Sequence, residues 1–413
     1  MSDEKKIINR WLVVVGAVLI QLALGSLYSW GRMTKYISNG GFLTQISEVT
    51  AYIFGISLAA FAITMIFAGK LQQKYGPRNI SLLGVVFIGV GTISSAFMEA
   101  NFWGLFITYG ILYGMGIGFT YVCPIATATA WFPDKKGLIS GIAVAGFGAG
   151  SFIFNFLVDW FAAISIPIMY LLLGIIYVVI ISIGALTMIR PPDGWLPEGF
   201  VPPKVTEISS EGMVEFSRKE MINTKQFWLL WFSYMLGCMP GLLVIGTYTV
   251  FAETAGIDPL LSISVLLTLV GSIAALFNGL GRISWGKVAD IFNYKKALIM
   301  LFAVQALALF LYFTTIINYG YYFVITCVIF FCFGGNLSLY PTATADLFGN
   351  KNLGQNYGIM FTAYGVAGFI QAVATQNIVI ALGGYLPLYI IVGVFTIVSL
   401  VLVFLITNPK KND

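Results

Sequence analysis

Histidine is absent from this sequence of 413 residues, and its four cysteines are scattered through long apolar stretches. Histidine is the commonest metal ligand and the side chain that most readily carries a proton near neutral pH. The cysteines Cys123, Cys238, Cys327 and Cys332 show neither zinc-ligand spacing nor a disulfide framework. We therefore expect no metal and no cofactor. Nor does the sequence offer the nucleophile or acid–base pair that an enzyme would need.

Charged side chains are also scarce, because Asp, Glu, Lys and Arg together make up only 9% of the chain while apolar residues make up 59%. Soluble globular proteins carry roughly 25% charged residues. So few charges cannot cover a surface that faces water, so we expect most of the surface to face a lipid bilayer. The net charge of +5 comes from short Lys and Arg clusters between apolar stretches, a pattern typical of membrane loops and not of nucleic-acid binding.

Twelve apolar stretches are long enough to cross a membrane, for which about 20 residues are needed. Only helices and closed barrels satisfy their backbone polar groups in lipid, and these stretches lack the alternation of barrel strands. The sequence therefore predicts an all-α membrane protein with twelve transmembrane helices. They are expected at residues 11–30, 51–71, 80–97, 102–131, 138–162, 167–189, 227–251, 260–285, 297–316, 321–347, 357–382 and 387–406.

The one long polar stretch, residues 190–225, divides these helices into two sets of six. It opens on Pro191 and Pro192, and proline ends a helix. We expect an N-terminal bundle over residues 1–189, a cytoplasmic linker over 190–225 and a C-terminal bundle over 226–413. A constant offset in residue number relates Gly69 to Gly286, Pro124 to Pro341, Thr127 to Thr344, Gly141 to Gly358 and Gly148 to Gly365. Repeated halves of this kind are typical of transporters.

Basic residues predict the orientation in the cell's inner (cytoplasmic) membrane. With a cytoplasmic N-terminus, all but three of the 22 Lys and Arg fall in cytoplasmic segments. Arg32 and Lys35 fall outside, and Arg282 lies within a span. The first span follows Lys5 and Lys6 but has no obvious cleavage site, so we expect an uncleaved helix. Both termini are expected in the cytoplasm.

Arg282 is the most informative residue, because it lies in the eighth predicted span about 12 Å from Asp290 at 1.5 Å per residue. No acidic residue lies deep enough in any span to neutralise it, and such a charge costs at least about 2.5–3.5 kcal/mol. Its planar fork matches a carboxylate. Asn278, one turn earlier on the same face, could also donate to a bound anion. The alternatives are a snorkelling arginine and an asparagine that joins two helices.

Aromatic residues are expected near the middle of the membrane in several spans. Single aromatic residues in so apolar a chain often only pack against lipid, but tyrosine hydroxyls need polar partners, which favours a role in binding for the three tyrosines. The group comprises Tyr28, Trp30, Tyr121, Phe333, Phe361 and Tyr364.

Two loops carry similar signatures, one from Gly69 to Arg78 and one from Gly286 to Lys296 that includes Asp290. They resemble the two copies of the loop signature of the major facilitator superfamily, with Gln73 in place of the usual acid of the first copy. The resemblance implies that Gly69, Arg78, Gly286 and Asp290 gate the two halves and do not select the substrate. Ordinary basic loops are the alternative interpretation.

Four further segments resemble the oxalate/formate antiporter family, which is similar to the monocarboxylate (lactate and pyruvate) transporters of that superfamily. They are Trp131–Gly137, Tyr121–Pro124, Phe277–Arg282 and Pro191–Pro197. The resemblance implies the major facilitator fold, with two pseudo-symmetric six-helix bundles, and a central site in which Arg282 grips the substrate carboxylate. The aromatic positions of that site would be Tyr28, Tyr121, Phe147, Phe333 and Phe361.

The sequence departs from this pattern at Tyr364, where the oxalate exchanger has a second cation, a lysine. One positive charge matches one carboxylate, so we expect a monocarboxylate such as lactate, pyruvate or formate, carried by alternating access. Asn278 stands where animal proton-coupled carriers have a titrating aspartate, so both proton symport and anion exchange stay open. Oxalate/formate exchange is the alternative, and a membrane sensor that does not transport is least favoured. We expect the protein to work as a monomer.

Overall fold

The computed structural model describes residues 9–39, 47–99, 101–192, 195–197, 215–254, 263–312, 318–349, 352–382 and 384–409. Lys5, Lys6 and the linker residues 193–194 and 198–214 lie outside the described residues. Every regular element within the described ranges is a helix, which confirms the all-α class. Among the described residues, twelve helical segments are long and apolar enough to cross a membrane, which confirms the predicted number.

The first six spans form the N bundle. The second, third, fifth and sixth of them are single α-helices, whereas the first and the fourth contain a short 3₁₀ or π segment. The elements are α1 (Arg10–Leu24), η1 (Gly25–Ser29), α2 (Trp30–Asn39), α3 (Ser47–Tyr75), α4 (Pro77–Ser95), α5 (Phe102–Leu105), η2 (Phe106–Tyr113), α6 (Gly114–Trp131), α7 (Lys136–Ala162) and α8 (Ile166–Leu186).

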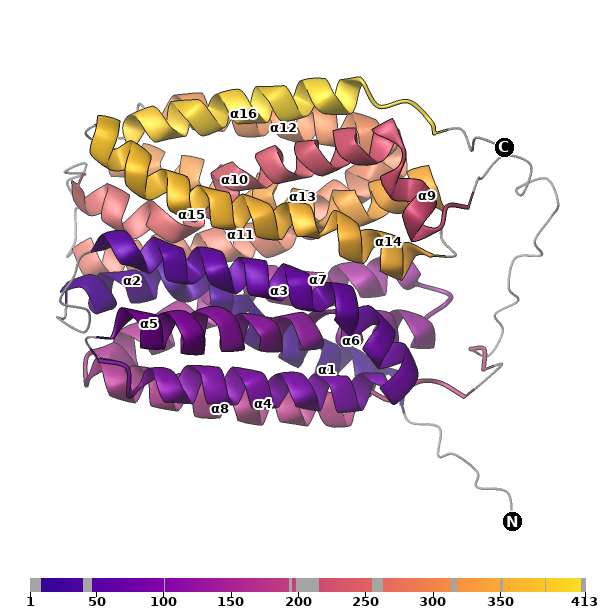
Figure 1. Ribbon diagram of the computed structural model, residues 1–413, viewed down its shortest axis with the longest axis horizontal. Coiled ribbons are helices and arrows are strands. Elements are labelled where there is room, and N and C mark those ends of the chain that lie inside the picture. The colour runs from indigo at the N-terminus through magenta and orange to yellow at the C-terminus, as the bar shows by residue number, and fades with distance from the viewer. Residues whose placement is uncertain are drawn as a thin grey trace, which may run out of the picture.

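The last six spans form the C bundle, which is preceded by one short helix. Its elements are α9 (Arg218–Ile222), α10 (Lys225–Thr254), α11 (Ile263–Phe292), α12 (Tyr294–Leu311), α13 (Tyr319–Phe348), α14 (Leu353–Met360), α15 (Thr362–Leu382) and α16 (Leu386–Phe404). The two bundles lie side by side with their long helices running between the same two ends (Figure 1). We call the end at which α1 begins, α16 ends and α9 lies the terminal end, and the opposite end the distal end.

The same backbone device turns the chain in both bundles at the terminal end. Gly76 has a φ of 84° between α3 and α4, and Asn293 has a φ of 79° between α11 and α12. Glycine and asparagine are the residues that adopt this left-handed conformation most readily. These positions are related by the offset that relates the two halves of the sequence, so the repeat extends to local backbone geometry.

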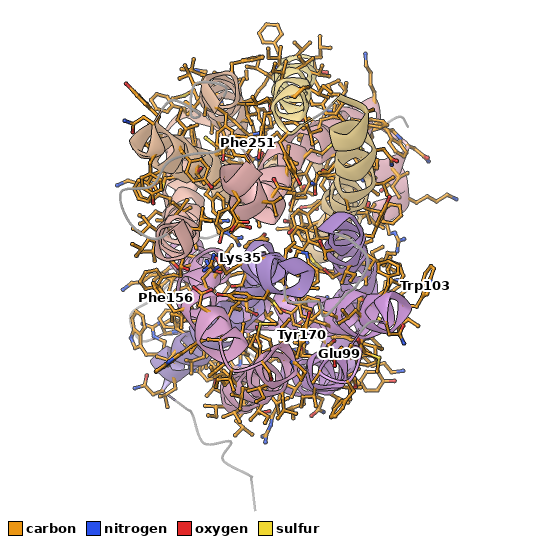
Figure 2. The ribbon with its side chains drawn as sticks, turned by 90° about the vertical axis from the view of Figure 1, so that its left-hand side faces the viewer. Lys35, Glu99, Trp103, Phe156, Tyr170 and Phe251 are labelled. Atoms are coloured by element: carbon orange, nitrogen blue, oxygen red, sulfur yellow. The ribbon has the colours of Figure 1, made fainter. Side chains whose placement is uncertain are left out.

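The flanks of the molecule are apolar, as a lipid-facing surface requires. Trp103 is 68% exposed and points away from the N bundle (Figure 2). Many other large apolar side chains are exposed on α4, α8, α12 and α16. Soluble monomers rarely expose so much contiguous apolar surface. The structure therefore describes a multi-pass membrane protein.

The bundles meet along two helix pairs, α7 with α11 and α3 with α15. At the distal end the seam is closed by polar contacts. The Thr249 hydroxyl donates to the Gly31 carbonyl at 2.6 Å, and the Lys35 ammonium lies 3.5 Å from the Glu253 carboxylate. Lys35 lies between the bundles when the molecule is viewed from this end (Figure 2).

Arg32 lies within the first span and not in the loop in which the sequence analysis placed it. The first span continues to Ile37, past its predicted end, and Arg32 is fully buried on α2. Its guanidinium pairs with Asp159 of α7 at 2.5 and 3.1 Å. The Thr268 hydroxyl of the C bundle donates to the same carboxylate. Sequence reasoning missed this pair because both residues lie near the ends of their spans, where charges are common.

Candidate functional site

Arg282 lies on α11 at the seam with α7. Its side chain is 1% exposed, which excludes the alternative that it snorkels into water. Its Nε donates to Asn278 Oδ1 at 3.2 Å, and its Nη1 donates to the Val144 carbonyl of α7 at 3.0 Å. The guanidinium carbon is 5.2 Å from the centre of the Phe147 ring. No carboxylate pairs with Arg282 among the residues that the structure describes.

Two donors in this cluster have no hydrogen-bond partner within the described ranges: Arg282 Nη2 and Asn278 Nδ2. Both residues are buried, and Arg282 occupies the oxygen end of the Asn278 amide. A buried donor without an acceptor costs about 1–3 kcal/mol, and more when it is charged. The cluster is therefore built to receive an acceptor, preferably an anion.

The close approach of α7 to α11 depends on Gly148. A Cβ atom at this position would lie 2.8 Å from Asn278 Oδ1 and 2.9 Å from Arg282 Nε. No real Cβ tolerates such distances to fixed neighbours. Gly148 thus allows the guanidinium to lie directly against the α7 backbone, which is how Arg282 reaches the Val144 carbonyl.

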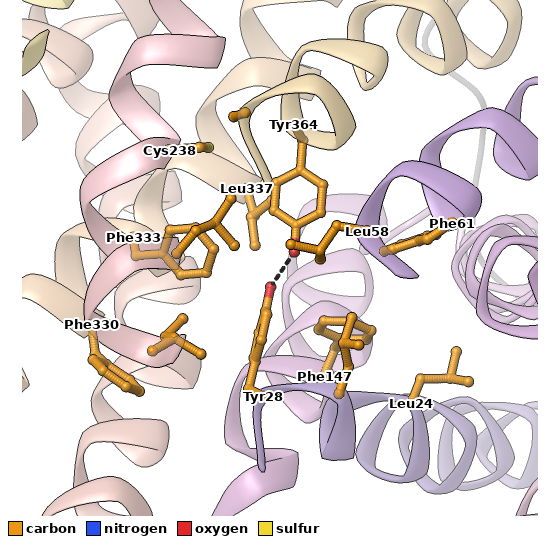
Figure 3. Packing of buried hydrophobic residues seen from close by; sticks show 14 of the residues in the cluster. Leu24, Tyr28, Leu58, Phe61, Phe147, Cys238, Phe330, Phe333, Leu337 and Tyr364 are labelled. Atoms are coloured by element: carbon orange, nitrogen blue, oxygen red, sulfur yellow. Dashed lines mark hydrogen bonds between the residues drawn. The ribbon is translucent and has the colours of Figure 1, made fainter. Parts of the chain in front are cut away.

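Aromatic rings from both bundles pack together next to the guanidinium, which lies over the Phe147 ring. The Tyr28 and Tyr364 hydroxyls are 3.1 Å apart and form a hydrogen bond across the seam (Figure 3). Tyr28 packs edge-on against Phe147 at 5.3 Å and against Phe333 at 5.7 Å between ring centres. Phe361 packs on Tyr364 at 4.9 Å. The cluster is thus a continuous aromatic layer that crosses from one bundle to the other.

The structure brings together all eight residues predicted to bind substrate, each at most 3% exposed: Tyr28, Tyr121, Phe147, Asn278, Arg282, Phe333, Phe361 and Tyr364. Tyr121 packs against Phe147 at 5.2 Å, and its hydroxyl interacts electrostatically with Arg282. Trp30, in contrast, faces away and stacks on Tyr109 inside the N bundle at 4.9 Å.

Sequence reasoning missed Phe61 of α3. Its ring lies 5.2 Å from Tyr121 and 5.1 Å from Phe361, so it links the two bundles within the aromatic layer. The constant offset that relates the halves takes Phe61 to Asn278 and also Phe147 to Tyr364. Mapping the site through the internal repeat would therefore have found Phe61.

The four residues predicted to gate the halves lie at the terminal end, away from Arg282. Arg78 and Asp290 are exposed, and Gly286 has open space where a side chain would begin. Gly69 lies at the contact between α3 and α14. A Cβ atom added to Gly69 would lie 4.0 Å from the carbonyl oxygen of Gly354. Asp290 interacts electrostatically with Asp346 of α13. Of the four, only Gly69 faces the other bundle, and none of them touches the central cluster in any contact that the structure describes.

A small polar cavity of about 30 Å³ lies between the bundles toward the distal end. A cavity of this size has room for about one or two water molecules. Its lining combines residues of α2 and α3 with residues of α10 and α15, including Thr34, Phe54, Thr247 and Gln371. In the described part of the chain, no group of three or more Asp, Glu, Cys or His side chains could hold a metal ion.

Two bundles of membrane-crossing helices, with a buried cation and an aromatic layer at their seam, define a polytopic carrier and not an enzyme. The chain belongs to the major facilitator superfamily, whose family model matches residues 8–372 and also residues 269–413. This membership confirms the fold predicted from the loop signatures.

Three similar proteins extend this finding. The uncharacterized MFS-type transporter YhjX of Escherichia coli is 29% identical over 87% of this chain and 85% of its own. The oxalate:formate antiporter of Oxalobacter formigenes is 29% identical over 89% and 86%. The apicoplast pyruvate carrier 1 of Toxoplasma gondii is 24% identical over 92% and 86%. The predicted resemblance to carboxylate carriers is thus confirmed at the level of homology.

Proposed function

We propose that the protein is a secondary active transporter of small monocarboxylates of the lactate, pyruvate or formate type. The observation that carries the proposal is the pair of buried, unpartnered donors, Arg282 Nη2 and Asn278 Nδ2. A carboxylate has two oxygens and a negative charge, so it satisfies both donors and neutralises the guanidinium. Hydrogen bonds to charged groups contribute about 1.5–3 kcal/mol each. The aromatic layer would enclose the small apolar body of the substrate.

The charge of the site favours one carboxylate over two. Arg282 is the only cation in contact with the aromatic layer among the described residues, and Tyr364 supplies a hydroxyl where the oxalate exchanger has a lysine. A dianion would leave one negative charge in a buried apolar environment, which is costly. The second candidate is oxalate/formate exchange, which the similarity to the Oxalobacter antiporter favours.

Alternating access would proceed by rocking of the two bundles about the central site. The distal seam is closed by Thr249, Lys35 and Glu253, so the structure represents a conformation closed at that end. We propose that the terminal end is cytoplasmic, as the basic residues predict, in the inner membrane of the cell. The loops with Gly69, Arg78, Gly286 and Asp290 would then border the cytoplasmic gate. Since Asn278 cannot titrate, the substrate itself would carry any coupled proton, or a second anion would be exchanged.

The decisive test replaces Arg282 by glutamine and measures uptake of labelled lactate, pyruvate and formate into proteoliposomes. Uptake is expected to fall to background, because glutamine cannot neutralise the anion, while the purified protein stays monodisperse. Arg190→Gln is the matched control, since this arginine donates to the Gln72 and Gln73 carbonyls at the terminal end. Normal uptake by Arg282→Gln would refute the assignment.

A counterflow assay separates the two candidate functions. Vesicles are preloaded with unlabelled lactate, formate or oxalate, with and without a pH gradient, and labelled uptake is followed. Acceleration by lactate or formate alone supports the monocarboxylate carrier. Acceleration by oxalate supports the exchanger instead.

A further inference from the structure

The first span changes geometry where it reaches the candidate site. A five-residue 3₁₀ turn, η1, separates α1 from α2 and carries Tyr28. A stretch of 3₁₀ helix inside a longer helix often marks a functional hinge. The Tyr28 hydroxyl is 3.1 Å from that of Tyr364 in the other bundle, so a small displacement of η1 would break this contact.

A second irregular segment lies behind this turn. The fourth span contains a π-helix, η2, and such segments are rare and frequently found at functional sites. The Tyr113 hydroxyl of η2 is 3.0 Å from Ser26 Oγ of η1. Ser26 already donates its single proton to the Ala23 carbonyl at 2.6 Å. Tyr113 is therefore the donor in this bond.

The same π-helix also packs against Trp30, the first residue after η1. The Tyr109 ring stacks on Trp30 with centres 4.9 Å apart and on Tyr113 at 4.5 Å. All three side chains are at most 1% exposed. Residues four apart on a helix lie on the same face, which allows the two tyrosines to stack. Tyr28 thus lies in the chain between two residues that η2 contacts. Ser26 is bonded to Tyr113, and Trp30 stacks on Tyr109.

We propose that Tyr113 and Tyr109 are positioning residues that hold η1 so that Tyr28 reaches across the seam. Neither tyrosine touches Arg282 in any contact that the structure describes. They act through Tyr28, which packs on Phe147 of its own bundle and on Phe333 of the other. Pre-organised contacts raise affinity by reducing the ordering needed on binding. Losing the Tyr113 donor therefore weakens substrate binding more than it slows turnover. The binding consequence rests on the proposed carboxylate site.

A double-mutant cycle tests the link between Tyr113 and Tyr28. Tyr113→Phe is expected to raise the KM for lactate exchange about three- to tenfold, the equivalent of one hydrogen bond, with the maximal rate within about twofold. In the Tyr28→Phe background the same substitution should have no further effect, because the hydroxyl that it positions is gone. Equal fold-changes in both backgrounds would show that Tyr113 is merely structural.

Ser95→Ala is the matched control, because it removes a buried hydroxyl pair between α4 and the same π-helix, Ser95 Oγ with Thr108 Oγ1 at 2.9 Å. Its KM is expected to stay within about twofold of the wild type. A comparable rise would mean that η2 acts through general stability.

Hydrogen exchange of residues 24–30, followed by mass spectrometry, needs no substrate. Tyr113→Phe is expected to speed exchange there several-fold, whereas Ser95→Ala leaves it unchanged. Unchanged exchange in Tyr113→Phe would overturn the positioning proposal. If exchange is faster in Tyr113→Phe but the wild-type protein binds no carboxylate, the positioning proposal stands and only the proposed function is overturned.

Discussion

At the scale of single residues, the candidate site depends on how closely α7 approaches the Arg282 side chain. Gly148 is the position at which this closeness can be tested. A methyl group there would meet Asn278 Oδ1 at 2.8 Å, and overpacking of this kind costs about 1–3 kcal/mol. We expect Gly148→Ala to weaken carboxylate binding by roughly tenfold, measured by titration calorimetry on the purified protein.

Gly141→Ala is the matched control for this experiment. It lies on the same helix, and nothing lies within 4 Å of the Cβ that it would add. The affinity of the Gly141→Ala variant for the carboxylate is expected to equal that of the wild type. Wild-type affinity in Gly148→Ala would show that α7 can move back without disturbing the guanidinium, and that the close approach has no role in binding.

The central residues could be predicted from the sequence because of their chemistry. A lone arginine in the eighth predicted span, about 12 Å from Asp290, is costly, and the resemblance to carboxylate carriers implied that it lies in a central site. The Val144 carbonyl could not be predicted, because a backbone acceptor leaves no trace in residue identity. Phe61 was missed because one phenylalanine in an apolar helix is unremarkable unless its symmetry-related position is examined.

At the scale of helices, hydropathy located the spans but not their internal geometry. The fourth span was predicted over residues 102–131, and the structure has the same limits. The π-helix within it is as apolar as its neighbours, whereas the 3₁₀ turn of the first span, Gly25–Ser29, contains one glycine and two serines. Their geometry follows from tertiary contacts such as the stacking of Trp30 on Tyr109, which no local pattern encodes. The Arg32–Asp159 pair was missed for another reason, because charges near the ends of spans are common.

The contact between α2 and α10 offers a prediction at this scale. Thr249 donates to the Gly31 carbonyl across the distal seam, and one such bond is worth about 0.5–1.5 kcal/mol. Thr249→Val should therefore raise the population open at the distal end about two- to tenfold. The measurement is the maleimide labelling rate of Ala51→Cys, which lines the small distal cavity, in a background without the native cysteines.

Thr344→Val controls for the loss of a buried threonine hydroxyl. Thr344 donates to the Tyr340 carbonyl within α13, so its bond does not join the bundles. Labelling of Ala51→Cys is expected to stay at the wild-type rate in this variant. Equal acceleration by both substitutions would indicate general loosening of the structure and not opening of the distal seam.

At the scale of the whole molecule, the site lies where the two halves repeat each other. Phe147 and Tyr364 are related by the offset between the halves, and so are Phe61 and Asn278, yet the partners differ in polarity. The repeat thus provides a seam that both bundles line. The two halves differ in sequence at the site, and its one charged side chain, Arg282, belongs to the C bundle. The boundaries at residues 189 and 225 stay a prediction.

If the two bundles rock about the central site, as proposed, the distal seam is a gate that must open in every cycle. The Lys35 ammonium and the Glu253 carboxylate are 3.5 Å apart and partly exposed, so both positions can be reached by reagents. Joining Lys35→Cys to Glu253→Cys with a short, reducible bis-thiol reagent is expected to abolish lactate exchange. Binding to the detergent-solubilised protein should persist, because the substrate can still enter from the terminal end.

The two single-cysteine variants control for chemical modification, and each should keep its exchange activity after treatment with the same reagent. Cleavage of the cross-link by a reductant should restore exchange in the double variant. An exposed ion pair contributes at most about 1 kcal/mol, so the substitutions themselves are expected to be tolerated. Undiminished exchange with the distal ends joined would mean that the substrate passes without separation of α2 from α10, and a rocking mechanism would be wrong for this protein.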